Sequence, residues 1–196
     1  MKAENRERRV TAGNKSFLKE NVAIISGLVI LCLFLTFMSD SFLTQSNLMS
    51  LLRQMTNNVF LTLGVMMCII IGGIDISVGS VFALGGTVAA GMIAHYHVPI
   101  PAAIMLGLLA GAACGAFNGF FVSMVRVPAF IATMAMLNIA RGIAYLMTNA
   151  EPIRCTEKAF TNLGTGRLGI IPLPVIYAVA WVILIWLFLN KTRMGR

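Results

Sequence analysis

Long runs of apolar residues recur along this chain and are separated by short polar segments. Several of these runs approach the roughly 20 consecutive apolar residues that a transmembrane helix needs. Backbone N–H and C=O groups in lipid must be paired within the protein, so runs of this kind are helical. The alternating pattern of a transmembrane β-barrel is absent. The pattern therefore predicts an all-α fold, a polytopic helical bundle in a membrane.

Six transmembrane helices are expected from this pattern. Their approximate limits are residues 22–38, 58–71, 81–94, 102–125, 129–148 and 173–189. Residues 1–20 are polar and basic, which indicates a cytoplasmic tail, so the transmembrane domain is expected over residues 21–196. Between the first two runs, apolar residues return at helical spacing, which predicts a short helix lying at the membrane interface. These residues are Leu48, Leu51, Leu52 and Met55.

Composition and charge fit the same class of protein. Only 11% of the residues are charged and 58% are hydrophobic, whereas a soluble domain carries about 25% charged residues. Six spans place both ends of the chain on the same side of the membrane. If the N-terminus is inside, the inner segments hold ten Lys and Arg residues and the outer segments hold four. Basic residues favour the cytoplasmic side, so a cytoplasmic N-terminus is expected. No nucleic acid is expected as a partner, because a basic surface for it would need a folded soluble domain.

The segment "IGGIDISVGS", residues 71–80, interrupts the apolar pattern between the second and third runs. Gly72 and Gly73 allow the chain to bend there, because glycine adopts backbone conformations that other residues avoid. Asp75 is the only acidic residue in the middle half of the chain, and its carboxylate can cap a new helix. At membrane depth a carboxylate costs at least about 2.5 kcal/mol, so it faces a cavity or a partner there.

Two interpretations of this segment stay open. In the first, it is a cytoplasmic turn and Asp75 is an ordinary helix cap. In the second, it is a break at membrane depth that lines a pathway, as broken helices do in transporters. The flanking runs are only about 14 residues each, shorter than a full span, which favours the break at depth. The candidate pathway residues here are Gly72, Gly73, Asp75, Ser77 and Gly79.

Small residues form a stripe along the fourth run. Gly107, Gly111, Gly115 and Gly119 recur every four residues, so one helix face is almost bare backbone. Such a face lets a neighbouring helix approach closely, and we interpret the stripe mainly as a packing surface, with lining of a pathway as the alternative. Asn118 lies beside the stripe and is predicted to bond across helices.

Two polar residues of the fifth run share one helix face, because Asn138 and Arg141 are three positions apart. Arg141 can extend its side chain to the outer surface, or it can pair with an acidic group inside the bundle. The first arrangement, or a structural hydrogen bond, is favoured. For an ion pair with Arg141 inside the bundle, Asp75 is the only candidate partner. Asn118, Asn138 and Arg141 complete the set of candidate pathway residues.

Residues that would carry out catalysis are not apparent in the sequence. The four cysteines lack metal-ligand spacing, and His95 and His97 alone make a poor metal site. The phosphate-binding pattern GxxxxGK[ST] does not occur, and no nucleophile, base and acid stand together. The chain is therefore expected to have no catalytic, metal-binding or cofactor-binding residues and not to be an enzyme.

Four stretches resemble one known family. "IIIGGIDISVGSVFALGG", "AGAACGAFNGFFV", "RVPAFIATMAMLNIARGIAYLMTN" and "KTRMGR" look like the permease subunits of bacterial ABC importers for ribose, xylose and related monosaccharides. The resemblance runs from about residue 20 to the end of the chain. It implies a cytoplasmic-membrane protein with two permease subunits, identical or different, that form the pathway and work by alternating access. It also implies a separate ABC ATPase subunit that hydrolyses ATP, and an extracytoplasmic sugar-binding protein.

The chain departs from this family at its C-terminus. Members of the family have about ten spans, and the cytoplasmic segment that contacts the ATPase follows the point where this chain stops. We therefore expect an N-terminal portion of a permease, truncated at the C-terminus, with Gly195 and Arg196 at the edge of the coupling region. Two alternatives stay open. One is a proton-coupled secondary transporter with Asp75 as the relay, and the other is a truncated membrane protein that transports nothing.

Overall fold

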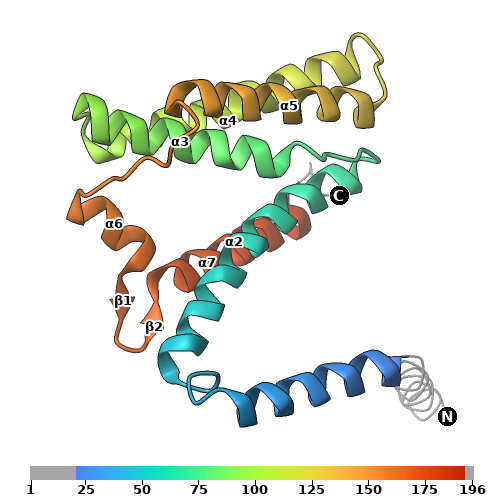
Figure 1. Ribbon diagram of the computed structural model, residues 1–196. Helices are drawn as coiled ribbons and strands as arrows, with labels where there is room; N and C mark the ends of the chain where they lie inside the picture. Colours follow the sequence, from blue (N-terminus) through green and yellow to red (C-terminus); the bar gives the residue numbers. More distant parts are fainter. Residues whose placement is uncertain (1–20, 193–196) are drawn as a thin grey trace, which may run out of the picture. The chain divides into compact units, whose positions relative to one another are not determined.

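The computed structural model describes residues 21–192, and the expected cytoplasmic tail 1–20 lies outside them. The chain divides into two compact units, Met1–Ser50 and Leu51–Arg196. A first helix covers Asn21–Met38. The labelled elements follow in the order α2 (Gln45–Ile70), α3 (Val78–Tyr96), α4 (Ile100–Ser123), α5 (Ala129–Thr148), α6 (Lys158–Thr165), β1 (Arg167–Leu168), β2 (Ile171–Pro172) and α7 (Leu173–Lys191) (Figure 1).

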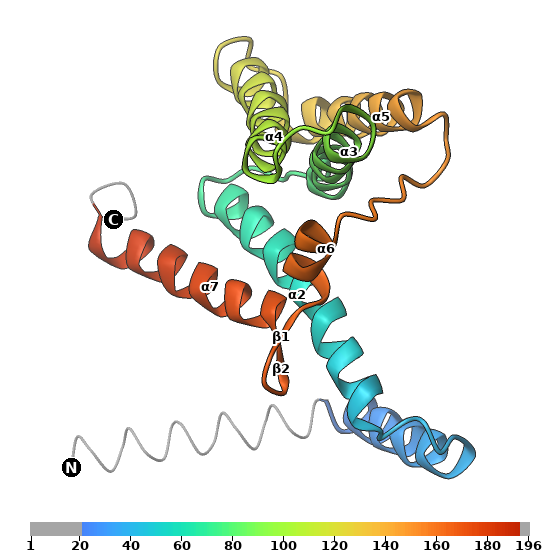
Figure 2. The same ribbon diagram turned by 90° about the vertical axis from the view of Figure 1, so that its left-hand side faces the viewer.

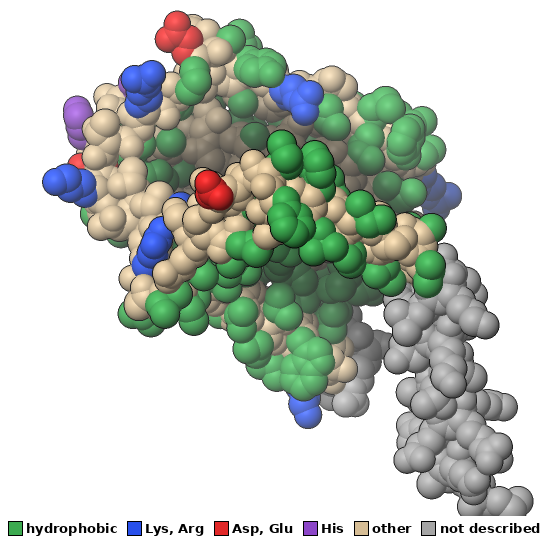
Figure 3. Space-filling model, turned by 60° about the horizontal axis from the view of Figure 1, so that its bottom comes forward, with side chains coloured by type: hydrophobic (Ala, Val, Ile, Leu, Met, Phe, Trp, Pro, Cys, Tyr) green, Lys and Arg blue, Asp and Glu red, His purple; other side chains and the backbone are tan. Residues whose placement is uncertain are grey.

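The expected helical membrane fold is confirmed. Five of the described helices are long and apolar enough to cross a membrane, namely Asn21–Met38, α3, α4, α5 and α7. The sixth expected span is the C-terminal half of α2. This helix has 26 residues but is not among the five, since Gln54, Asn57 and Asn58 in its middle lower its average hydropathy. Hydrophobic side chains cover much of the face shown in Figure 3, and charged ones are few and scattered.

The separate interfacial helix expected before the second span is not present. Its residues are part of α2, which runs without a break from Gln45 to Ile70. The helix starts beside Thr44, whose hydroxyl accepts a hydrogen bond from the backbone N–H of Asn47. No glycine or proline follows until Gly64, so nothing in the backbone stops the helix at the expected boundary.

Three helices of the second unit, α3, α4 and α5, lie side by side, as Figures 1 and 2 both show. Their shared core contains Leu84 of α3 together with Met136 and Ala140 of α5. Cys114 of α4 packs against this cluster from the third side. The three helices thereby form the best-packed part of the described chain, and they carry most of the candidate site residues.

Helices α3 and α4 approach each other closely at Gly85 and Gly107. A Cβ atom added to Gly107 would lie 2.6 Å from the carbonyl oxygen of Gly85, which is shorter than real contacts allow. Only part of the predicted packing stripe is used in this way. Gly111 would make ordinary contact with Val81, whereas Gly115 and Gly119 face open space. Gly85, on the partner helix, was not predicted.

The polar loop expected before the last span contains structure of its own. Helix α6 is followed by a two-stranded antiparallel hairpin, in which Arg167 pairs with Pro172 and Leu168 with Ile171. The hairpin turns at Gly169, which adopts a positive φ of 63° that favours glycine. Helix α7 begins directly after the second strand, so the hairpin sets where this span starts.

The contact at Gly107 yields a matched pair of variants. Gly107→Ala forces a methyl group into the backbone of α3, and we expect the free energy of unfolding to fall by about 1–3 kcal/mol. Gly115→Ala, on the same helix, places its methyl group in open space and is expected to cause no loss, because alanine is the better helix former. The free energies are measured by denaturant titration of the purified chain in mixed micelles. Equal values for the two variants would contradict the close packing.

Candidate functional site

The segment between α2 and α3 is the candidate site, and it begins with a specific helix ending. The N–H of Gly72 donates to the carbonyl of Ile69, and the N–H of Gly73 donates to the carbonyl of Cys68, both at 2.9 Å. These two bonds form a Schellman motif, which needs a left-handed residue just after the helix. Gly72 fills that position with φ of 81°. The predicted bend is therefore at Gly72, and glycine is required there.

The cap predicted at Asp75 is shifted: Ser77 is the residue that precedes α3 as its N-cap, and Asp75 bonds to Ser77 rather than to the helix itself. One carboxylate oxygen of Asp75, Oδ1, accepts hydrogen bonds from the backbone N–H of Ser77 at 2.8 Å and from its hydroxyl at 2.6 Å. Ser77 is 1% exposed and precedes α3 directly. A negative charge beside the N-terminus of a helix is favourable, because the unpaired N–H groups carry partial positive charge there. Asp75 thus stabilises the first turn of α3.

Asn118 connects this turn to α4. Its side-chain N–H donates to the hydroxyl oxygen of Ser77 at 3.2 Å, so Asn118, Ser77 and Asp75 form one chain of hydrogen bonds. Asn118 is 8% exposed, and its side-chain oxygen has no hydrogen-bond partner among the described residues. The bond across helices that the sequence predicted for Asn118 is confirmed.

Thr133 of α5 holds the same segment from the other side and was not predicted. Its hydroxyl oxygen accepts the N–H of Ile76 at 3.4 Å, and it lies 3.3 Å from the carbonyl oxygens of Ile74 and Phe130, to which it donates. Thr133 is 4% exposed. A single threonine in an apolar run attracts little attention, and only its burial against the backbone of residues 74–76 reveals the role.

The lengths of the two flanking helices bear on where the interruption lies. Helix α3 has 19 residues, which at 1.5 Å per residue is about 28 Å, close to the thickness of the hydrocarbon core. Helix α2 has 26 residues. The expectation of two short spans was therefore wrong, since both helices extend beyond their apolar runs. The interruption is a capped turn between two full-length helices.

The two polar residues predicted on α5 do not join this network. Asn138 is exposed, and its side-chain N–H donates to the carbonyl of Met134 in its own helix. Arg141 is exposed as well, and no ion pair joins it to Asp75 among the described residues. Arg141 instead lines a hollow between α3 and α5 that Gly79 also lines. Gly195 and Arg196 lie outside the described residues.

The site is therefore a set of hydrogen bonds between helices. Side chains from α4 and α5 bond to the turn that leads into α3, so the start of α3 is positioned by both neighbours. The predicted residues Asp75, Ser77 and Asn118 are brought together, with Gly72 and Gly73 shaping the turn before them. Asn138, Arg141 and Gly79 are separate from this network.

Comparisons with known proteins agree with one another. The profile of the family described as "Branched-chain amino acid transport system / permease component" matches residues 47–196. The chain is 37% identical over 186 residues to "Ribose import permease protein RbsC" of Escherichia coli (strain K12), covering 93% of this chain and 57% of the relative. It is 37% identical over 172 residues to the protein of the same name from Bacillus subtilis (strain 168), covering 87% and 53%.

A more distant relative is "D-allose transport system permease protein AlsC" of Escherichia coli (strain K12). It is 31% identical over 168 residues, which cover 86% of this chain and 52% of the relative. The chain thus spans little more than half the length of these relatives. No solved structure matches the chain.

Proposed function

Because the chain belongs to the family of branched-chain amino acid transport system permease components, we propose that it is the permease subunit of an ABC importer whose substrate is a monosaccharide. The observation that carries this proposal is the 37% identity to a ribose import permease over 93% of the chain. Relatives named for D-allose and galactofuranose transport support the same class of substrate. The resemblance noted in the sequence is thereby confirmed at the level of the family.

The proposed mechanism divides the work between several proteins. A separate ABC ATPase subunit hydrolyses ATP on the cytoplasmic side, and an extracytoplasmic binding protein delivers the sugar. Two permease subunits, identical or different, form the pathway and alternate between inward-open and outward-open states. This chain supplies helices to that pathway, and the firm connection between α3, α4 and α5 lets these helices move together when the ATPase changes state.

The pathway itself is proposed to lie beside the interruption between α2 and α3. The candidates are Gly72, Gly73, Asp75, Ser77, Gly79, Asn118, Asn138 and Arg141. The hydrogen-bonded group of Asp75, Ser77 and Asn118 supports this placement, because such groups are rarely built into a membrane-spanning bundle unless a cavity or partner needs them.

Uptake measurements test the transport proposal. Deleting the gene should reduce uptake of radiolabelled ribose, allose or arabinose to background, and uptake of proline should be unchanged. In cells whose F-type ATP synthase is inhibited, uptake should survive collapse of the proton gradient and stop when ATP is depleted. The reverse result would identify a proton-coupled carrier. If sugar uptake is unchanged after the gene is deleted, the protein does not transport these sugars.

The same assay includes one substitution in the capped turn. Asp75→Asn keeps an oxygen that accepts both bonds from Ser77, so folding should be preserved. A pathway that depends on the charge would then lose uptake, which is the expected result. Unchanged uptake would leave Asp75 with only its structural bonds to Ser77.

We propose a location in the bacterial cytoplasmic membrane with the N-terminus in the cytoplasm, which places the segment between α5 and α7 outside. Cys155 lies in that segment and is partly exposed, whereas Cys32, Cys68 and Cys114 lie within helices. A membrane-impermeant maleimide should therefore label the protein in intact spheroplasts, and Cys155→Ser should abolish the labelling. Labelling that appears only after the membrane is permeabilised would place this segment inside and reverse the proposed orientation.

A further inference from the structure

A hollow lies between α3 and α5, and several polar side chains are set among its mostly apolar lining. Its volume is about 520 Å³, within the range of sites for small molecules. The polar side chains that line it come from α3, from α5 and from the segment that follows α5. They are Ser80, Thr87, Arg141, Tyr145, Thr148 and Glu151.

Ser80 has a hydroxyl without a partner. Its side-chain oxygen is buried, the residue is 5% exposed, and no hydrogen bond reaches this oxygen among the described residues. Other hydroxyls in these helices bond to a carbonyl of the preceding turn, as Ser123 does to Gly119 at 2.7 Å and Thr148 to Tyr145 at 3.4 Å. A buried hydroxyl without such a bond is unfavourable unless something else supplies the partner. Ser80 lines the hollow, so a molecule bound there can supply it.

Two side chains of opposite charge line the same hollow without an ion pair between them, so the net charge of the lining is zero. Arg141 and Glu151 both contribute to the lining, and no ion pair joins them among the described residues. Arg141 belongs to a membrane-spanning helix, where a charged side chain is rare and faces a cavity or a partner. The two formal charges cancel, so the hollow suits a neutral ligand with several hydrogen-bonding groups better than an anion or a cation.

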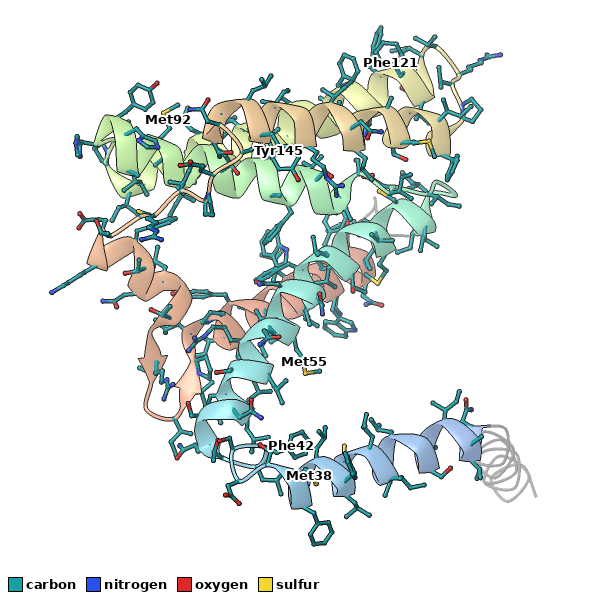
Figure 4. All side chains as sticks on the ribbon, viewed as in Figure 1. Met38, Phe42, Met55, Met92, Phe121 and Tyr145 are labelled. Atoms are coloured by element: carbon teal, nitrogen blue, oxygen red, sulfur yellow. The ribbon has the colours of Figure 1, made fainter. Side chains whose placement is uncertain are left out.

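The shape of the hollow also leaves room for a ligand. Gly79 and Gly86 line it from α3, and a Cβ atom at either position would meet nothing within 4 Å. At the far end, the segment after α5 folds over α3, since Ile153 lies 3.4 Å from where a Cβ of Gly91 would be. Tyr145, labelled in Figure 4, supplies an aromatic ring and a hydroxyl from α5. An aromatic ring of this kind packs well against the C–H face of a sugar ring.

We propose that this hollow binds a neutral monosaccharide. Arg141 donates to neighbouring sugar hydroxyls, Glu151 accepts from others, and Ser80 and Thr87 bond to the opposite edge of the ring. The proposal rests on the proposed function, because a transported sugar is the ligand that brings these hydroxyls into the bundle. It assigns Arg141 a role in binding rather than in extending to the membrane surface.

Saturation-transfer NMR on the purified full chain in detergent tests this assignment, with ribose, allose and arabinose as probes. The unaltered chain should bind at least one of these sugars. Arg141→Gln should weaken the affinity about tenfold or more, as expected for loss of a hydrogen bond to a charged group. Ser80→Ala and Glu151→Gln should weaken it as well. The controls are Arg126→Gln and Ser123→Ala, which lie outside the hollow and should bind like the unaltered chain.

Three outcomes would overturn the inference. If all three hollow variants still bind sugar, the hollow is not the binding site. The proposed transport function would then stand, provided that uptake depends on the gene. Binding of leucine that depends on Arg141, without sugar binding, would mean that the opposite charges hold a zwitterion, and would contradict both proposals. No binding of any probe would reject the hollow as a sugar site. If Arg141→Gln does not fold, Arg141→Lys with Ser80→Ala carries the test.

Discussion

The structure depends on how the backbone is paired at the turn between α2 and α3. The N–H and C=O groups at the end of one helix and the start of the next have no partners within their own helices, so the turn and its neighbours supply them. Between α2 and α3 the partners come from three sources. The N–H groups of Gly72 and Gly73 donate to carbonyls in the last turn of α2. The N–H of Ser77 donates to Asp75, and the hydroxyl of Thr133 bonds to the backbone of Ile74 and Ile76.

This pairing explains why three helices behave as one group. Two of the partners, Asn118 and Thr133, come from α4 and α5, so these bonds form only while both helices stay in place beside α3. The close approach of Gly85 and Gly107 brings α3 and α4 together at a second point. A group of helices fixed at both places can move as a unit. The hollow between α3 and α5 lies within the same group.

Much of this arrangement follows from local sequence signals. Five of the six spans follow from the length of the apolar runs, and the bend follows from Gly72. The carboxylate of Asp75 indicated a helix start, but the residue that caps α3 is Ser77. The continuity of α2 was missed because Gln54, Asn57 and Asn58 resemble the edge of a membrane. Helix formation needs only the absence of a breaker, and none occurs there. A polar stretch therefore does not by itself mark the end of a helix.

The contacts between distant segments could not be predicted in the same way. Thr133 is 57 residues from Ile76 along the chain, and Gly85 faces Gly107 only when α3 and α4 adopt one particular register. The register of α3 against α4 cannot be predicted from a single sequence. The glycine stripe indicated a packing surface but not which part of it is used, and the hollow beside Arg141 depends on a segment that folds back after α5.

Hydrogen exchange at residues 71–80 tests most directly whether cross-helix pairing holds the interruption. The purified chain in nanodiscs is compared with Thr133→Val, which removes the hydroxyl, with Thr133→Ser, which retains it, and with Thr148→Val, whose hydroxyl bonds only to its own helix. Thr133→Val should speed the exchange of this segment. The other two variants should match the unaltered chain. Equal exchange in all four proteins would show that the interruption is stable without its cross-helix partner and would contradict the account.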